Sequence, residues 1–229
     1  SHPAFIDAAR DEILKKENTI PFGRGLSYGD VCLNKQGRLI ATSFLDRIVC
    51  ADWEKGIIRA ETGLTFDEIL QVSVPRGWFL PVSPGTKFIS LGGAIANDVH
   101  GKNHETAGTL GCHVRKIGLA RSTGELLELT TNEELFTATI GGLGLTGLVL
   151  WVELQLKPIK SAYFDTETFS LANLDAFFRC AEESEDWEYS AAWINCLAKG
   201  KNLGSGVFTR GRHAETGGFE VHRNSRWNI

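Results

Sequence analysis

The spacing of apolar residues along the chain predicts short helices that alternate with short strands. Phe5, Ile6, Ala9 and Ile13 recur at the spacing of one helical face, with charged residues between them. Residues 3–16 are therefore predicted to form a helix.

Two further helices are predicted from a Thr-x-x-Glu spacing, which is typical of a capping box at a helix N-terminus. In the first, Thr65 precedes Glu68, and Pro75 marks the end of the helix. In the second, Thr131 precedes Glu134. Both helices are expected to begin directly after their threonine.

Strands are indicated by short apolar runs and by alternation of apolar and polar positions. The clearest case is residues 150–157, where leucine or valine at every second position alternates with Trp151, Glu153, Gln155 and Lys157. Further strands are predicted at 19–22, 39–42, 56–61, 113–119, 125–129, 163–167, 190–196 and 206–210. This mixture of short helices and strands predicts the α+β fold class.

A predicted strand near residue 161 begins a new unit, which predicts two domains, at residues 1–160 and 161–229. In the second domain a helical face at 174–181 lies between predicted strands. No terminating element follows the last of these strands. The second domain is therefore expected to be truncated in this sequence.

Composition and charge disfavour several classes of protein. With a net charge of −4 and no basic stripe, the chain is not expected to bind nucleic acid. The five cysteines are odd in number, and no CxxC occurs, which favours reduced thiols and gives no metal framework. No apolar run reaches about 18 residues, so no membrane span is expected. A cytoplasmic location is expected, with a membrane-associated or periplasmic parent protein as the alternative.

Two glycine-rich stretches carry the strongest chemical signal. Residues 23–30 read GRGLSYGD, and residues 84–104 contain Pro84-Gly85-Thr86 and a Gly92-Gly93 pair. Glycine has no Cβ, reaches positive φ at little cost and leaves its N–H open to an anionic ligand. The two stretches are about 60 residues apart and are expected to grip one extended, phosphate-bearing cofactor.

Three other motifs give weaker evidence of function. Residues 142–147 fit GxGxxG, but the predicted order is helix, glycines, strand, so a structural turn that touches a cofactor edge is preferred to a Rossmann fingerprint. Ser27 lies in a near-GxSxG sequence that no helix follows, which disfavours a nucleophilic serine. His100 and His104 are separated by a glycine and an asparagine that disfavour a helix, so no metal site is predicted. His104 and His113 are interpreted as loop-packing histidines.

The glycine-rich residues carry a family resemblance. Residues 23–30 resemble the phosphate loop of FAD-linked oxidases of the vanillyl-alcohol-oxidase type. The resemblance narrows to the decaprenylphosphoryl-ribose oxidases and their bacterial relatives through residues 84–86, 92–96, 98–104 and 108–111. It implies a two-lobed FAD-binding domain followed by a truncated α+β substrate domain.

The same resemblance implies which residues hold FAD. Leu26 stands where covalently flavinylated relatives carry histidine, so non-covalent attachment is implied. Ser27 would donate a hydrogen bond to phosphate or ring, and Tyr28 would either pack in the core or, preferably, stack beside the cofactor. The implied cofactor-binding residues are Pro21, Phe22, Gly23, Arg24, Gly25, Leu26, Ser27, Tyr28, Gly29, Asp30, Val31, Gly85, Thr86, Ser90, Leu91, Gly92, Gly93, Asn97, Asp98, Val99, His100 and Val149.

The activity implied by the resemblance is oxidation of a secondary alcohol of a sugar or polyol, with hydride passing to flavin N5. His100 is expected to polarise the substrate and Lys102 to stabilise an oxyanion or phosphate. The alternatives are a loop-packing histidine and a solvated lysine. The substrate is expected to be free or lipid-linked, and a partner reductase is left open. Alternative functions are an aldonolactone or alditol oxidase, and a non-catalytic FAD-binding fragment.

Overall fold

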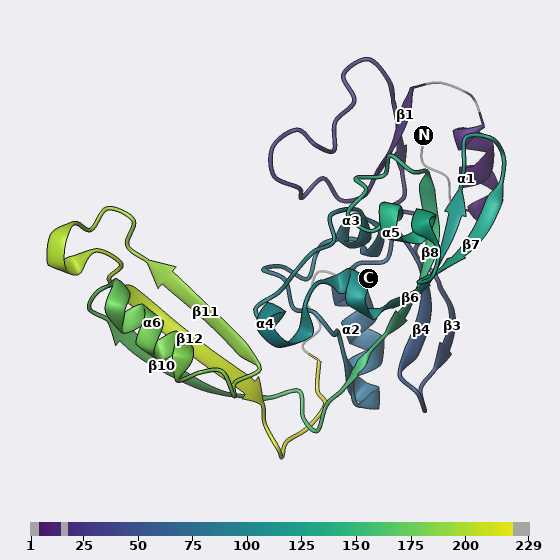
Figure 1. The fold of residues 1–229 in the computed structure, drawn as a ribbon. Helices are drawn as coiled ribbons and strands as arrows, with labels where there is room; N and C mark the ends of the chain where they lie inside the picture. Colours follow the sequence, from purple (N-terminus) through teal and green to yellow (C-terminus); the bar gives the residue numbers. More distant parts are fainter. Residues whose placement is uncertain (1–4, 15–17, 222–229) are drawn as a thin grey trace, which may run out of the picture.

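A five-stranded antiparallel sheet forms the centre of the molecule (Figure 1). The structure, a computed structural model, describes residues 5–14 and 18–221. The strand order across the sheet is β3 (Ile48–Asp52), β4 (Ile57–Glu61), β8 (Leu148–Gln155), β6 (Val114–Ala120) and β7 (Leu126–Thr130). Strand β8 lies in the middle because its alternate residues, from Leu148 to Leu154, are all buried, as the period of two predicted.

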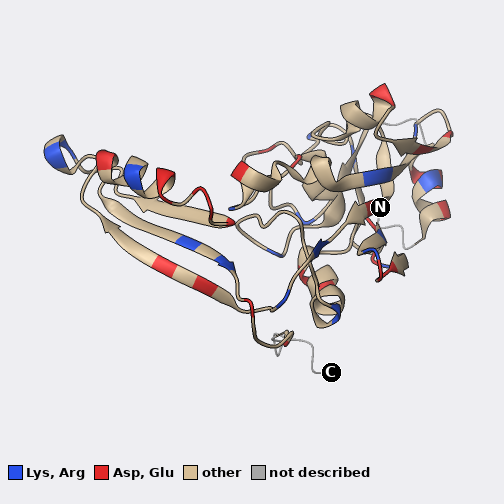
Figure 2. Cartoon of the chain, turned by 60° about the horizontal axis from the view of Figure 1, so that its bottom comes forward, with Lys and Arg blue, Asp and Glu red and all other residues tan. Residues whose placement is uncertain are grey.

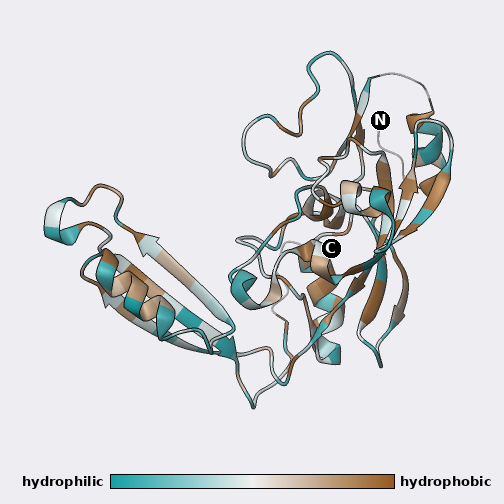
Figure 3. Cartoon of the chain, viewed as in Figure 1, coloured by the Kyte–Doolittle hydropathy of each residue, from teal (hydrophilic) through white to brown (hydrophobic). Residues whose placement is uncertain are grey.

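Two helices pack on the sheet and complete the main core. They are α2 (Phe66–Ser73), which a short 3₁₀ turn η1 (Val74–Arg76) follows, and α3 (Leu91–Ala96). Phe66 and Ile69 of α2 and Leu91 and Ile95 of α3 are fully buried against the sheet. The main core is visible in Figure 3 as apolar colour along the strands that these helices face.

The N-terminal segment forms a second, smaller core. Helix α1 (Ile6–Ile13) packs Ala9 and Ile13 against Leu148 and Leu150 of β8. The helix confirms the predicted element, of which residues 3, 4, 15 and 16 lie outside the described residues. Strands β1 (Thr19–Phe22) and β2 (Arg38–Ala41) form a parallel pair beside it, joined by the long loop of residues 23–37.

The remaining elements before residue 160 connect these layers. They are β5 (Trp78–Phe79) paired with β9 (Lys157–Pro158), and the short helices α4 (His104–Ala107), η2 (Leu110–His113) and α5 (Glu134–Thr139). Within the described residues, no helix is both long and apolar enough to cross a membrane.

A second sheet of three strands extends away from the central sheet (Figure 1). Its order is β10 (Phe164–Leu171), β12 (Gly206–His213) and β11 (Tyr189–Ile194). Helix α6 (Leu174–Glu182) and a 3₁₀ turn η3 (Gly200–Asn202) complete it, and Phe177 of α6 packs on Phe208 of β12. We call residues 164–213 the C-terminal unit.

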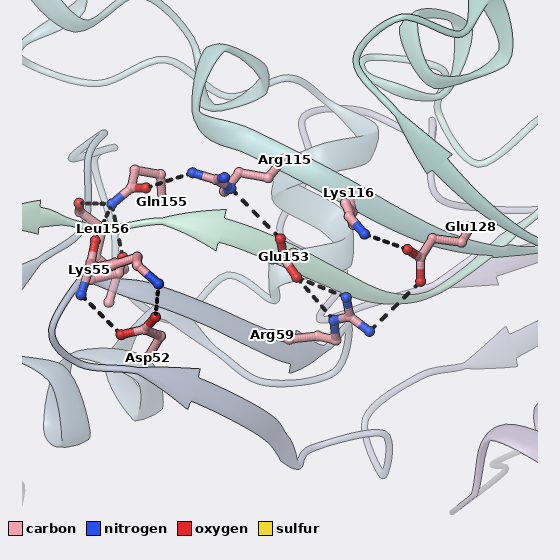
Figure 4. A network of polar contacts seen from close by, with 10 residues as sticks. Asp52, Lys55, Arg59, Arg115, Lys116, Glu128, Glu153, Gln155 and Leu156 are labelled. Atoms are coloured by element: carbon pink, nitrogen blue, oxygen red, sulfur yellow. Dashed lines mark hydrogen bonds and ion pairs between the residues drawn. The ribbon is translucent and has the colours of Figure 1, made fainter.

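Charged residues of both signs alternate over both parts of the molecule (Figure 2). On the central sheet they form a ladder across neighbouring strands (Figure 4). Arg59 bonds Glu153 at 2.8 Å and lies 4.1 Å from the ring centroid of Trp151. Lys116 donates to Glu128 and holds the pKa of that carboxyl below its ordinary value. Such cross-strand pairs support the sheet register.

The structure corrects two predictions and adds two strands, β3 and β5. Residues 91–96, interpreted as a glycine loop, are the helix α3. Thr131 does not cap α5; the helix begins one residue after Glu133, whose carboxylate accepts hydrogen bonds from Thr130 instead. These two strands were not predicted because the apolar run of β3, Ile48-Val49-Cys50, is short, and β5 has only two residues.

Candidate cofactor cleft

A cleft of about 470 Å³ lies between the loop after β1 and helix α3. Fourteen of the residues singled out for cofactor binding line it: Pro21, Gly23, Arg24, Gly25, Leu26, Ser27, Tyr28, Val31, Gly85, Ser90, Gly93, Asn97, Val99 and His100. The two glycine-rich stretches thus meet at one cavity.

Contact between the two stretches is direct. A Cβ added to Gly23 would lie 2.3 Å from Ser90 Oγ and 3.9 Å from the Cα of Gly93. Only glycine therefore lets the first loop approach the beginning of α3 this closely. Gly23, Ser90 and Gly93 all line the cleft.

Free backbone amides face the cleft from the first loop. Within the described residues, the N–H groups of the lining residues 24–28 and of Gly85 have no hydrogen-bond partner. Gly25 and Gly29 have φ angles of 65° and 60°, a backbone region that favours glycine. Successive unpaired amides in such turns form an anion-binding concavity, so this loop can neutralise a diphosphate without lysines.

Helix α3 uses its amides differently. Ser90 caps the helix by accepting a hydrogen bond from Gly93 N–H at 3.3 Å. The amides of Leu91 and Gly92 donate to the carbonyls of Leu64 and Thr62, at 2.7 and 2.8 Å. These two amides are therefore already paired, and the fully buried Leu91 side chain belongs to the core.

Eight of the predicted cofactor-binding residues lie outside the cleft lining: Leu91, Gly92 and six others. Asp98 accepts a hydrogen bond from Gly111 N–H at 2.9 Å and so holds the following loop. Val149 is packed in the core of β8. The residues outside the lining are Phe22, Gly29, Asp30, Thr86, Leu91, Gly92, Asp98 and Val149. Their proposed contacts with a cofactor stay predictions.

His100 and Lys102, singled out for catalysis, occupy different positions. His100 is exposed and lines the cleft, with its ring centroid 5.6 Å from that of His104. The Lys102 side chain is exposed outside the lining, while its backbone N–H donates to the Ser83 carbonyl at 3.0 Å. His104 and His113 bond loop carbonyls through their rings, which agrees with their interpretation as packing residues.

Seven lining residues were not among the predicted cofactor-binding residues, although the turn that contains Leu143 was expected to touch a cofactor edge: Ile20, Cys32, Pro84, Ile89, Ala94, Ala96 and Leu143. Most of them are apolar and lie next to predicted residues, so proximity along the chain was the available signal. Leu143 belongs to the GxGxxG-like turn, which lies between α5 and β8 as predicted. Its N–H donates to the Ala96 carbonyl at 2.9 Å, which brings the turn to the cleft wall.

Comparison with known proteins gives a family match and several relatives. The family model described as "FAD binding domain" matches residues 5–130. The chain is 37% identical to decaprenylphosphoryl-beta-D-ribose oxidase of Mycolicibacterium smegmatis, over 84% of this chain and 43% of the relative. It is 29% identical to alditol oxidase of a Streptomyces species, over 44% of this chain and 24% of the relative.

A third relative is L-gulonolactone oxidase of Scyliorhinus torazame, 28% identical over 70% of this chain and 37% of that protein. The chain therefore spans less than half the length of each of these three relatives.

Proposed function

The chain belongs to the FAD binding domain family, with FAD as its cofactor, and we propose that it is part of an oxidoreductase that oxidises a secondary alcohol of a sugar or polyol. The observation that carries the proposal is the meeting of both glycine-rich stretches at one cleft. The names of the relatives, which include a ribose-derivative oxidase and an alditol oxidase, support the substrate class.

The residues present fit FAD. The unpaired amides of residues 24–28 and Gly85 would bind the diphosphate. Apolar side chains from three segments, Leu26, Ile89 and Leu143, would contact the rings. Attachment is proposed to be non-covalent because Leu26 has no nucleophilic atom. Release of all flavin from acid-denatured protein is the expected result; flavin retained on the chain would point to Cys32 or His100, the nucleophiles that line the cleft.

Bound FAD would supply the hydride acceptor. His100 is proposed to hydrogen-bond the hydroxyl of the substrate at the rim of the cleft and to orient the carbon that reacts. Lys102 is proposed to bind an oxyanion or phosphate of the substrate with its exposed ammonium. Both side chains stand on one segment whose backbone the Ser83 carbonyl holds.

The first prediction tests the cleft itself. A Cβ added to Gly85 would meet no atom within 4 Å, so Gly85→Val can fold while its side chain occupies the cleft. The variant is expected to bind FAD at least about tenfold more weakly, a loss of about 1.4 kcal/mol, with unchanged thermal unfolding of the apoprotein. Titration of apoprotein with FAD, followed by flavin fluorescence, measures the affinity.

Gly200→Asn is the matched control, because this glycine is also open to solvent but lies in η3, outside the cleft lining. Asparagine tolerates its φ of 59°. The control is expected to bind FAD as the parent does. Equal FAD affinity of Gly85→Val and the parent would place the cofactor elsewhere.

The second candidate function is an aldonolactone or alditol oxidase, which the relatives of those kinds favour. Bleaching of the bound flavin under anaerobic conditions by ribosides, alditols or lactones distinguishes the substrate classes in the full-length protein. A flavoprotein that none of these alcohols reduces would be a non-catalytic binding module.

A further inference from the structure

A cluster of polar side chains lies where the C-terminal unit meets the rest of the molecule. Lys157 comes from β9, Tyr189 is the first residue of β11 and Glu188 directly precedes it, and His213 is the last residue of β12. We call these four residues the joint cluster. The chain passes between the two parts twice, once before β10 and once after β12 (Figure 1).

A continuous series of polar contacts connects the four side chains of the joint cluster. The Lys157 ammonium pairs with the Glu188 carboxylate and lies 3.4 Å from the Tyr189 hydroxyl oxygen. The Tyr189 hydroxyl lies 3.4 Å from His213 Nε2, and His213 Nδ1 lies 2.9 Å from the Ser161 carbonyl oxygen. Burial lowers the pKa of His213 to about 4, so the ring is neutral at pH 7. Its Nδ1–H then donates to Ser161, and Nε2 accepts from the tyrosine.

Aromatic rings from both parts enclose the joint cluster. The ring of Phe79 in β5 lies 4.8 Å from that of His213. Phe164 in β10 lies 4.2 Å from His213 and 5.4 Å from Tyr189, which is only 7% exposed. The joint is thus a small, partly buried core, to which the cleft-bearing part gives Phe79 and Lys157 and the C-terminal unit gives the rest.

Backbone contacts connect this core to the rim of the cleft. Ser190, next to Tyr189 in β11, donates its N–H to the Lys102 carbonyl at 2.9 Å. Lys102 in turn donates to Ser83 and stands two residues from His100, which lines the cleft. A shift of β11 would therefore move the segment that carries His100.

We propose that the joint cluster holds the C-terminal unit in one orientation against the rim of the cleft, which makes Lys157 and Tyr189 positioning residues. Their importance for catalysis rests on the proposed function, whereas the fixed orientation does not. Lys157 and Glu188 are only 28% and 24% exposed, so their pair is screened little by solvent. The nearby pair Lys160–Glu215 is 69% and 76% exposed and contributes little.

The orientation is measured as the distance between spin labels on Cys50 of β3 and Cys196 beyond β11, both exposed. The FAD-loaded protein is used, with the other three cysteines replaced by serine. The parent and Glu215→Gln, which breaks only the exposed pair, are expected to give one narrow distribution. Lys157→Met and Tyr189→Phe are expected to broaden or split it, and Lys157→Arg to restore the narrow form because it keeps the charge.

The rate of trypsin cleavage after Lys160, in the connection between the two parts, tests the joint independently of the spin labels. It is expected to be about tenfold faster in Lys157→Met than in the parent, a matched comparison because both proteins keep the pair of Lys160 with Glu215 at the cleavage site. Should Lys157→Met not fold, Glu188→Gln removes the same ion pair. Distance distributions equal to those of Glu215→Gln, together with cleavage rates equal to those of the parent, would overturn the proposal. Failure of the parent to bind FAD would contradict the proposed function instead, and the label distances of the apoprotein would still test the joint.

Discussion

Two neighbouring histidines, His100 and His104, differ in their hydrogen bonds and in their position relative to the cleft. His104 Nδ1 lies 3.0 Å from the Gly101 carbonyl oxygen, so a hydrogen bond fixes its ring in the loop. Within the described residues the His100 ring has no hydrogen-bond partner, and it lines the cleft. An exposed imidazole with a free ring nitrogen is suited to hydrogen-bond a substrate hydroxyl.

We therefore expect His100→Ala to slow reduction of the flavin by substrate about 100-fold or more in the full-length protein. His104→Ala, which removes a neighbouring ring without a place in the cleft lining, is expected to leave the rate nearly unchanged. Stopped-flow absorbance of the flavin, with the alcohol that bleaches it fastest, measures both rates. Similar rates for the two variants would remove His100 from the reaction.

The position of the first glycine stretch at the cleft was predictable because its signal is local. Gly23, Gly25 and the amides around them face the cleft directly, and the sequence alone indicates open, flexible backbone. The position of Gly92 was not predictable, because the residue that requires a glycine there is distant in the sequence. A Cβ there would lie 2.8 Å from Thr62 Cβ, so this glycine allows α3 to pack on the residue that follows β4.

Helix α3 itself illustrates why the glycine-rich region was taken for a loop. Its two glycines each cost a helix about 1 kcal/mol relative to alanine. Tertiary contacts offset this, since Leu91, Ala94 and Ile95 are fully buried and Ser90 caps the N-terminus. Burial by a distant sheet is not visible in local sequence. By contrast, α2 and β8 were predicted because the capping residues and the period of two are themselves local signals.

The capping box of α2 supports the cleft as well as the helix. Thr65 accepts from Glu68 N–H at 3.2 Å, and the Glu68 carboxylate accepts from Thr65 N–H at 2.7 Å. Thr65 forms a bridge with Ser90, the cap of α3, and Glu68 lies 3.9 Å from Arg24 in the first loop. The beginnings of the two helices are thus fixed side by side.

Thr65→Ala is expected to lower the free energy of unfolding by about 1 kcal/mol, because N–H groups of the first turn lose their acceptor. Thr65→Ser, which keeps the hydroxyl, is expected to retain most of the stability. Urea unfolding followed by circular dichroism gives both values. A serine variant as unstable as the alanine variant would indicate that the threonine methyl, and not the cap, is what stabilises α2.

The arrangement of the whole chain depends on contacts that the sequence pattern does not encode. The pattern predicted β4, β6, β7 and β8, but not that β8 pairs with β4, which lies about 90 residues earlier, or that it occupies the middle of the sheet. The α+β class follows from counting elements, whereas strand order follows from which apolar faces fit together. The division at residue 160 stays a prediction, as does the substrate domain.

The joint cluster gives the whole molecule a specific dependence on pH. Burial, aided by the charge of Lys157, lowers the pKa of His213 from 6.5 to about 4. Between these values the unfolded chain binds a proton that the folded chain does not, so the free energy of unfolding falls as the pH is lowered from 6.5 towards 4. The expected loss is roughly 1–3 kcal/mol, allowing for partial exposure of the ring.

His213→Asn separates this contribution from the titration of carboxylates. Its side-chain amide would still donate to the Ser161 carbonyl but carries no charge at any of these pH values. The variant is expected to be less stable at pH 7.5, because it loses ring contacts with Phe79 and Phe164, yet to lose less stability on acidification than the parent. Urea midpoints at pH 7.5, 6.0 and 4.5 measure both slopes. Parallel slopes would mean that His213 is protonated as readily in the folded chain as in the unfolded one, and the joint would then be open to water.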